Sequence, residues 1–441
     1  MMNPFFAKAF KSFGILCIAF LSFASLSLSS CNSDDKEIKI SNTENNHSLP
    51  VVKITIDEKY LWSEDSGLFV AGNGSTENYL QKWEFPAYLS YYEFGEKAFT
   101  DTVGFRIKGH RSRHLPNKSI GLYWRSLYGR DILTHTVFKN NPVKKFERLK
   151  LHNGGSHGAH LLIRTASILR IIEGHTLLDF SSVQPVMVYI NKDYWGLYIL
   201  NEMITPHYFK YKYNLSKNNI NILKSDAIMP VVDDGSSNNW INTIIPFLKD
   251  NDLSDTANYE IAIDMIDKEL LIDYFIIETY ILNRDWPIFN MSWWNSTSGI
   301  NEFNKWRYII YDLDTSFEDP YSKELWLGDF YNNSENTVKN YSSGFFVFNA
   351  FMKNKSFRIA FFERYLYFIN SVFTEDNVRN KIDELTTEIG VEEYNRHIQR
   401  WDIKIGRTWL EGMESLNTFN KERREWIKPI IEAFLKDENN G

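Results

Sequence analysis

The stretch that decides the fold runs from residue 270 to residue 317 and has four consecutive parts. It reads LLIDYFIIETYIL (270–282), NRDWPIFN (283–290), MSWWNSTSGINEFNKWRYIIY (291–311) and DLDTSF (312–317). The first part is apolar and long enough for a buried helix. The third contains two strand-like runs, which a turn-rich STSG separates. The order is therefore helix, Asp-x-x-x-x-Asn loop, hairpin and Asp-x-Asp.

Asp285, Asn290 and Asp312 have the spacing and the setting that phosphoryl transfer requires. A carboxylate must orient the attacking hydroxyl, and oxygen ligands must hold Mg²⁺ against the nucleotide phosphates, because positioning and charge neutralisation supply most of the catalysis. In protein kinases one carboxylate and an Asn ligand share an Asp-x-x-x-x-Asn loop, and a second Asp follows a later strand. A lone Asp-x-x-x-x-Asn is a common turn pattern, so the interpretation depends on the helix, the hairpin and the Asp-x-Asp around it.

The same stretch resembles the CotH spore-coat protein kinases and their relatives in Bacteroidetes-type bacteria. The residues that carry the resemblance are NRD (283–285), Asn290 and WRYIIYDLDTSF (306–317). The resemblance implies an α+β, protein-kinase-like bilobal fold with a strand-rich N-lobe and a mainly helical C-lobe. It also implies that Asp285 and Asp312 are the essential pair, with Asp312 as a metal ligand.

The N-terminus has the pattern of a secretory signal peptide, because Lys8 and Lys11 precede an apolar run that is short for a membrane-spanning helix. LSSC (28–31) resembles a bacterial lipobox, which predicts a lipid on Cys31 and a protein anchored to a membrane. The acidic residues that follow resemble an export tag of Bacteroidetes lipoproteins. We therefore expect an outer-membrane lipoprotein exposed on the cell surface; the alternative is a plain signal peptide with an incidental cysteine.

The amino-acid composition indicates how large a core the chain can form and which partners it can have. Hydrophobic residues make up 43% and aromatic residues 16% of the chain, which is ample for a large core. One of the two cysteines, Cys17, lies in the signal segment, so no intramolecular disulfide is expected in the mature protein. The formal charge of −7 argues against a nucleic-acid partner. We expect a signal peptide at 1–30, a flexible tether at 31–50 and a kinase-like domain at 51–441, with its N-lobe at about 51–205 and its C-lobe at about 206–441.

Cations concentrate in RIKGHRSR (106–113) and in the return segment KSIGLYWR (118–125). A strand-turn-strand unit whose Lys and Arg side chains face a cleft can hold nucleotide phosphates. The unit resembles a basic element of the family, and the candidate phosphate ligands are Lys118, Arg111 and Arg113. The alternative is an exposed basic hairpin that only contributes solubility. A kinase-type Gly-x-Gly-x-x-Gly loop is absent from the first lobe.

Two further elements resemble the family. The hairpin 184–202 ends in YWGLYILNE, and since kinase-like folds pass from such a strand into the hinge beside the adenine, Glu202 is a candidate site residue. HIQRW (397–401) resembles a late family motif. The helix at 161–172 departs from the pattern, because relatives often carry Arg-Asp where this chain has Arg164 followed by Thr165.

We predict transfer of the γ-phosphate of ATP to a hydroxyl of a secreted or surface protein. Asp285 would orient the acceptor, and Asn290, Asp312 and Asp314 would hold Mg²⁺ or Mn²⁺. Because ATP is scarce outside the cytoplasm, the main rival is a non-catalytic kinase-like module for binding or adhesion. Transfer of AMP would use the same carboxylates and metal, so the sequence leaves that reaction open as well.

Overall fold

The computed structural model describes residues 49–155, 162–226, 229–320, 343–404 and 408–440. The chain divides into two units, and the first, Met1–Thr43, lies wholly outside these residues. The signal peptide, the lipidation site at Cys31 and nearly all of the tether are therefore outside the described part. All that follows concerns the second unit, Glu44–Gly441. No helix among the described residues is both long and apolar enough to cross a membrane.

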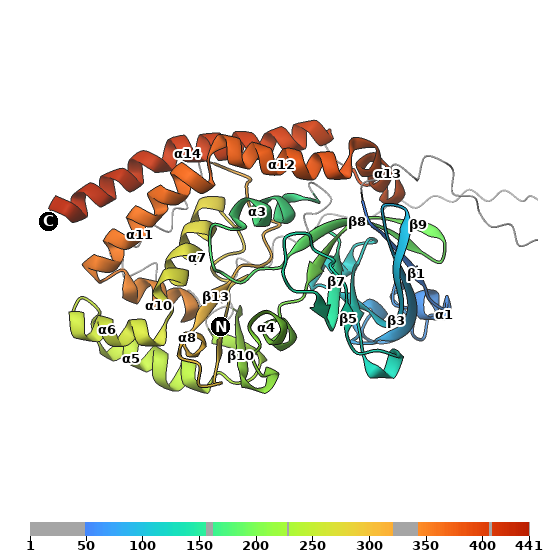
Figure 1. Cartoon of the computed structure of the whole chain (residues 1–441), viewed down its shortest axis with the longest axis horizontal. Helices are drawn as coiled ribbons and strands as arrows, with labels where there is room; N and C mark the ends of the chain where they lie inside the picture. The colour runs from blue at the N-terminus through green and yellow to red at the C-terminus, as the bar shows by residue number, and fades with distance from the viewer. Residues whose placement is uncertain (1–48, 156–161, 227–228, 321–342, 405–407, 441) are drawn as a thin grey trace, which may run out of the picture. The chain divides into compact units, whose positions relative to one another are not determined.

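A closed barrel forms the N-terminal part of this unit (Figure 1). Its strands, in the order in which they pair, are β1 (Val51–Thr55), β2 (Phe85–Glu93), β3 (Glu96–Lys108), β4 (Ser119–Tyr123), β7 (Arg148–His152), β9 (Asp193–Glu202) and β8 (Val183–Ile190). Neighbouring strands are antiparallel except β1 and β8, whose parallel pairing closes the barrel. Alternate apolar residues such as Val52 and Ile54 point inward, as a strand with one buried face requires.

A second sheet lies in the C-terminal part and carries the two strands that the sequence predicted after the catalytic loop. Its order is β11 (Met229–Asp234), β10 (Ile220–Asp226), β12 (Ser292–Ser296) and β13 (Arg307–Ile309). β12 and β13 pair antiparallel as expected, and the short helix α8 (Asn301–Asn304) is inserted between them. A small ribbon of β5 (Leu133–Thr134) and β6 (Lys145–Phe146) completes the strands.

The helices belong mainly to the C-terminal part. They are α1 (Lys59–Trp62), α3 (Arg164–Ile172), α4 (Pro206–Tyr213), α5 (Ile245–Asp250), α6 (Thr256–Met265), α7 (Lys268–Ile281), α10 (Ser343–Phe351), α11 (Lys355–Tyr367), α12 (Glu375–Ile389), α13 (Val391–Trp401) and α14 (Trp409–Asn440). With a strand-rich N-terminal part and a helical C-terminal part, the predicted α+β, kinase-like fold is confirmed.

Helix α7 is the centre of the largest hydrophobic core. Every residue from Leu270 to Ile281 is buried, which explains why its sequence is apolar on all sides rather than along one stripe. Asp267 caps its first turn by accepting a hydrogen bond from the Leu270 amide at 3.2 Å. Leu282 ends the helix in the left-handed conformation with φ of 52°. The chain thus leaves a rigid, buried helix directly into the Asp-x-x-x-x-Asn loop.

Candidate functional site

Asn283 ties the two predicted catalytic loops together. Its side-chain amide donates to Oε2 of Glu278 at 3.1 Å and to the backbone carbonyl of Asp312 at 3.3 Å. In return, its side-chain oxygen accepts a hydrogen bond from Oγ1 of Thr315 at 2.9 Å. Asn283 is buried, so these bonds are shielded from competing water. They fix the loop that carries Asp285 against the loop that carries Asp312.

Asn290 adds a second link between the same loops. Its Nδ2 donates to the backbone carbonyl of Asp312 at 3.2 Å. Both residues adopt left-handed backbone conformations, with φ of 58° at each. Asn and Asp tolerate this conformation better than most residues, which accounts for their presence at these two turns. The hydrogen bond uses the amide nitrogen of Asn290 and leaves its Oδ1 as a possible metal ligand.

Asp312 lies in a negatively charged environment. The pKa of its carboxyl group is raised to about 6, because burial and repulsion from Asp314 and Asp285 outweigh the opposing charges of Lys150 and Lys224. The residue still has contact with solvent, but the protein around it removes enough water to disfavour the charged form. Asp285 and Asp314 are therefore each close enough to interact with Asp312, which is what a cation site centred on Asp312 requires.

Asp314 is held from two sides. Its backbone carbonyl accepts a hydrogen bond from Nη1 of Arg164 at 2.7 Å. The backbone of Gly155, with φ of +79°, passes so close that a Cβ there would lie 2.3 Å from Oδ2 of Asp314. Only glycine fits this approach. Arg164 also pairs with Glu318 at 2.8 Å, and Glu318 pairs with Arg284 at 2.8 Å, so α3 is connected to both loops.

Lys150 on β7 is a further candidate site residue, which the sequence did not single out. It faces the C-terminal loops: burial lowers its pKa, and the negative charges of Asp312 and Asp314 act in the opposite direction. In the barrel, Lys150 is level with Gly121 of β4 and Arg106 of β3. The neighbours of Lys150 and Arg106 in their own strands, such as Leu149 and Phe105, point into the barrel core. Because side chains alternate along a strand, Lys150 and Arg106 both lie on the outer face of the barrel. The sequence signal that could have indicated Lys150 was the alternation of cationic and apolar residues in RLKLH (148–152).

Lys108, two residues beyond Arg106, extends this row. Burial, together with repulsion from Arg106, Lys150 and Lys224, lowers the pKa of Lys108 to about 8. Among the described residues, none of the three barrel cations Arg106, Lys108 and Lys150 forms an ion pair with a carboxylate. A row of cations without direct ion pairs is suited to an anion with several charges, such as a nucleotide phosphate chain.

The three cations predicted as phosphate ligands lie in or beside the turn between β3 and β4. Nζ of Lys118 donates to the carbonyls of Arg113 and Leu115, at 2.6 and 2.8 Å, and burial lowers its pKa to about 8. Arg113 donates to the carbonyls of Gly109 and Leu80, at 2.6 and 2.9 Å. Arg111 is exposed. In this structure Lys118 and Arg113 thus stabilise the turn, and phosphate contact by any of the three stays a prediction.

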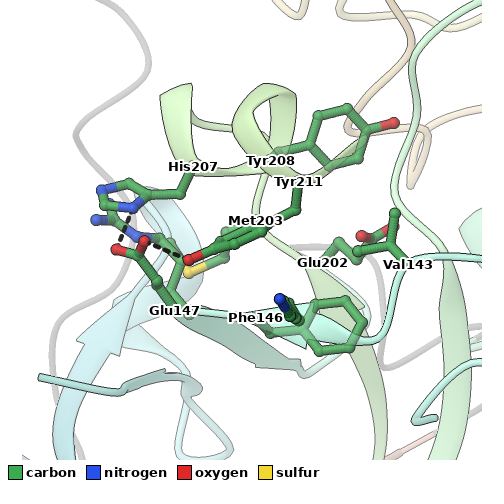
Figure 2. A pocket seen from close by; sticks show the side chains of 10 residues that line it. Val143, Phe146, Glu147, Glu202, Met203, His207, Tyr208 and Tyr211 are labelled. Atoms are coloured by element: carbon green, nitrogen blue, oxygen red, sulfur yellow. Dashed lines mark hydrogen bonds and ion pairs between the residues drawn. The ribbon is translucent and has the colours of Figure 1, made fainter. Parts of the chain in front are cut away.

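Glu202 lies at the end of β9, where the chain leads into α4. Its Oε2 accepts a hydrogen bond from the Ser182 amide at 3.2 Å, and burial raises its pKa. It lines a pocket of about 20 Å³, which Figure 2 shows with Glu147 pointing toward His207 and Tyr211. This volume suits a water rather than an adenine ring. None of the three catalytic-loop carboxylates lines the pocket.

The oxygen atoms of the two loops fit a magnesium ion that a nucleotide helps to bind. Within the described residues, no group of three or more His, Cys, Asp or Glu side chains forms a metal site by itself. Mg²⁺ usually takes one or two carboxylates and completes its octahedron with waters and substrate phosphates. Asp312 and Asp314, with Oδ1 of Asn290, would supply such a partial set, and a cation there would relieve the repulsion at Asp312.

Comparison with known proteins gives one family. A family model described as CotH kinase protein matches residues 105–427. The match includes β4, β7, α3, the two loops that carry Asp285 and Asp312, and the late HIQRW segment. A search of curated proteins found no match.

Proposed function

Since the chain belongs to the CotH kinase protein family, we propose that it transfers the γ-phosphate of ATP to a hydroxyl group of a secreted or surface protein. The observation that carries this proposal is the arrangement of charge. Asp285 and Asp314 both act on Asp312 from two linked loops, and the charges of Asp312 and Asp314 act on Lys150 of the barrel. Carboxylates for a metal opposite cations for phosphates are what phosphoryl transfer requires.

Each group has a distinct task in the proposed reaction. Lys150, Lys108 and Arg106 bind the phosphate chain and orient the γ-phosphate toward the C-terminal loops. Asp314, Asp312 and Asn290 would hold Mg²⁺ or Mn²⁺, which would supply charge neutralisation at the phosphates.

Asp285, which is exposed at the surface of its loop, accepts the hydroxyl proton and orients the acceptor oxygen for attack. Exposure suits this task, because a protein acceptor must reach the carboxylate. The oxygen bonds to phosphorus as the bond to the β-phosphate breaks, and ADP leaves with that electron pair.

The test is label transfer from ATP by a soluble form that begins at Ser33, with Mg²⁺ or Mn²⁺ and a general acceptor protein. γ-labelled and α-labelled ATP are used in parallel, with Asp285→Asn and Asp312→Asn as controls. Label from the γ position that both substitutions abolish supports the proposal. Label from the α position alone would make the protein an AMP transferase. No label and no nucleotide-dependent thermal shift would favour a kinase-like binding module.

We also propose that a lipid on Cys31 anchors the protein in the outer membrane, with the kinase-like domain on the cell surface. The support is the lipobox-like LSSC and the polar segment that follows it. Labelled fatty acid should be incorporated into the wild-type protein and not into Cys31→Ala. Protease added to intact cells should degrade the domain; a domain that resists until the cells are lysed would contradict surface exposure.

A further inference from the structure

Lys224 comes to the site from the second sheet, not from the barrel. It lies on β10, where it pairs in register with Ser292 of β12. The next residue, Ser225, donates its amide to the carbonyl of Met291 at 2.8 Å and accepts from the Met291 amide at 3.3 Å. β10 is thereby fixed beside the end of the loop that carries Asn290. The position of Lys224 relative to the metal ligands is set by a sheet, not by a flexible loop.

The ammonium group of Lys224 lies between an acidic partner and the Asp312 loop. Its Nζ is 2.9 Å from Oδ2 of Asp233 on β11 and 5.7 Å from the ring centre of Tyr311, the residue before Asp312. Its positive charge acts on Asp312, on Lys150 and on Lys108. Lys224 thus belongs to the same electrostatic cluster as the barrel cations, although it comes from the other part of the fold.

The Lys224–Asp233 ion pair is weak enough to be exchanged. Both side chains are 39% exposed, and ion pairs at such positions contribute little to stability because water competes for both charges. A polyphosphate carries more negative charge than the Asp233 carboxylate, so its oxygens form a stronger charge-assisted hydrogen bond with the Lys224 ammonium group than Asp233 does. When a polyphosphate enters the site, Lys224 can therefore leave Asp233 at little cost.

We propose that Lys224 is a catalytic residue of this protein that binds the phosphate chain of the nucleotide from the C-terminal side, and that Asp233 holds it in the nucleotide-free state. This inference rests on the proposed phosphotransferase function. As the acceptor oxygen bonds to the γ-phosphorus, the bond to the β-phosphate oxygen breaks and its electron pair stays on ADP, while the acceptor proton passes to Asp285. Lys224 stabilises the charge that gathers on the leaving β-phosphate.

The experiment compares the full chain with Lys224→Met, Lys224→Arg and Asp233→Asn, using ATP, ADP and adenosine with Mg²⁺. In Lys224→Met we expect turnover to fall about 10²-fold, as when one transition-state donor is removed. Affinity for ATP should also fall, while affinity for adenosine and the melting temperature stay near wild type. Lys224→Arg should restore part of the ATP affinity. Lys305→Met, which removes another exposed Lys–Asp pair, is the matched control and should change neither.

Asp233→Asn tests the second half of the inference without altering Lys224. Freed from its partner, Lys224 should bind ATP more tightly, with adenosine affinity unchanged; an unchanged ATP affinity would contradict the handover from Asp233. Wild-type ATP affinity and turnover in Lys224→Met would overturn the assignment, as would equal losses of ATP and adenosine binding. If the wild-type protein binds ATP but transfers no label, the proposed reaction fails while the binding measurements still decide the role of Lys224.

Discussion

Asp285 and Asp312 carry the same functional group in different settings, so their substitutions should differ. Asp285→Asn should lower turnover by about 10²–10⁴-fold, the range for loss of a general base, and leave Mg²⁺-dependent ATP binding intact. Asp312→Asn should remove that binding, because Asp312 interacts with Asp314 and Lys150, the residues proposed to hold the metal and the phosphates. Calorimetric titration with ATP, with and without Mg²⁺, separates the two effects. Asp264→Asn, a change at an 85% exposed carboxylate, is the control.

Glu278 is a fully buried acid beneath these loops. It accepts a hydrogen bond from Asn283, and its other oxygen has no hydrogen-bond partner among the described residues. Burial raises its pKa from 4.5 to about 8, so it is protonated and neutral at pH 7. The folded protein therefore binds one more proton than the unfolded chain between about pH 4.5 and pH 8. Through Glu278, stability should fall as pH rises through this window.

Glu278→Gln isolates that contribution. The neutral amide resembles the protonated acid but does not titrate, so the variant should lose less stability than the wild type between pH 5 and pH 8. Melting temperatures across this range provide the measurement. The other titrating groups contribute equally to both proteins, so the difference between the two curves reports Glu278 alone. Parallel curves for the two proteins would show that Glu278 is already ionised in the folded state.

At the scale of elements, α14 supports the end of α7. Arg423 is completely buried, and its guanidinium group donates to the carbonyls of Thr279 and Tyr280 at 2.8 and 3.2 Å. These carbonyls lie in the last turn of α7, where no later helical amide is available to bond them. A cation there also interacts favourably with the helix dipole. The start of the catalytic loop thus depends on a helix more than a hundred residues later in the chain.

Arg423→Met should reduce the free energy of unfolding by about 3 kcal/mol, because it leaves two buried carbonyls without a charged donor. Arg379 of α12 provides the control: it forms a longer contact with Glu414 of α14 at 3.5 Å, and both side chains are exposed. Arg379→Met should cost less than about 1 kcal/mol. Denaturant unfolding measures both variants. Equal losses would mean that the bonds from Arg423 to α7 contribute no more than an exposed contact.

Local sequence patterns predicted the elements around the catalytic loops well. The apolar run from Leu270, capped by Asp267, became α7, and the two runs after the loop became β12 and β13. The cations opposite the carboxylates were harder to find. Lys150 and Lys224 reach the site only because β7 and β10 pair with particular neighbours in a particular register. That register depends on contacts between distant segments, which no local pattern of charge reports.

At the scale of the whole domain, the late HIQRW segment (397–401) connects the C-terminal helices to the barrel. Nδ1 of His397 on α13 accepts a hydrogen bond from the Leu197 amide of β9 at 3.0 Å. Tyr194 donates to Glu393 at 2.6 Å, and Arg400 donates to the carbonyl of Tyr194 at 2.8 Å. Figure 1 shows α13 beside β8 and β9. The motif was recognisable in the sequence, but its contact with the barrel was not.

His397 should make this connection sensitive to acid. Burial lowers its pKa from 6.5 to about 4, so the unfolded chain binds more protons than the folded protein between these values. Stability contributed by His397 is present above pH 6.5 and is lost as the pH falls toward 4. His397→Asn can still accept a hydrogen bond but does not titrate, and its melting temperature should fall less on acidification. Hydrogen exchange at the Leu197 amide provides a local readout.

The closed barrel also has a consequence for the order of folding. Its first strand, β1, completes the ring only by pairing with β8, and the outer side of β9 is covered by a helix 200 residues further along the chain. Contacts between such distant segments form late, because the intervening chain must first lose its freedom. A ribosome or a translocation channel that releases the chain from its N-terminus would thus deliver every residue up to α13 before the barrel acquired its full set of neighbours. The barrel, although it comes first in the sequence, can therefore gain its last packing contacts only after α13 has been released.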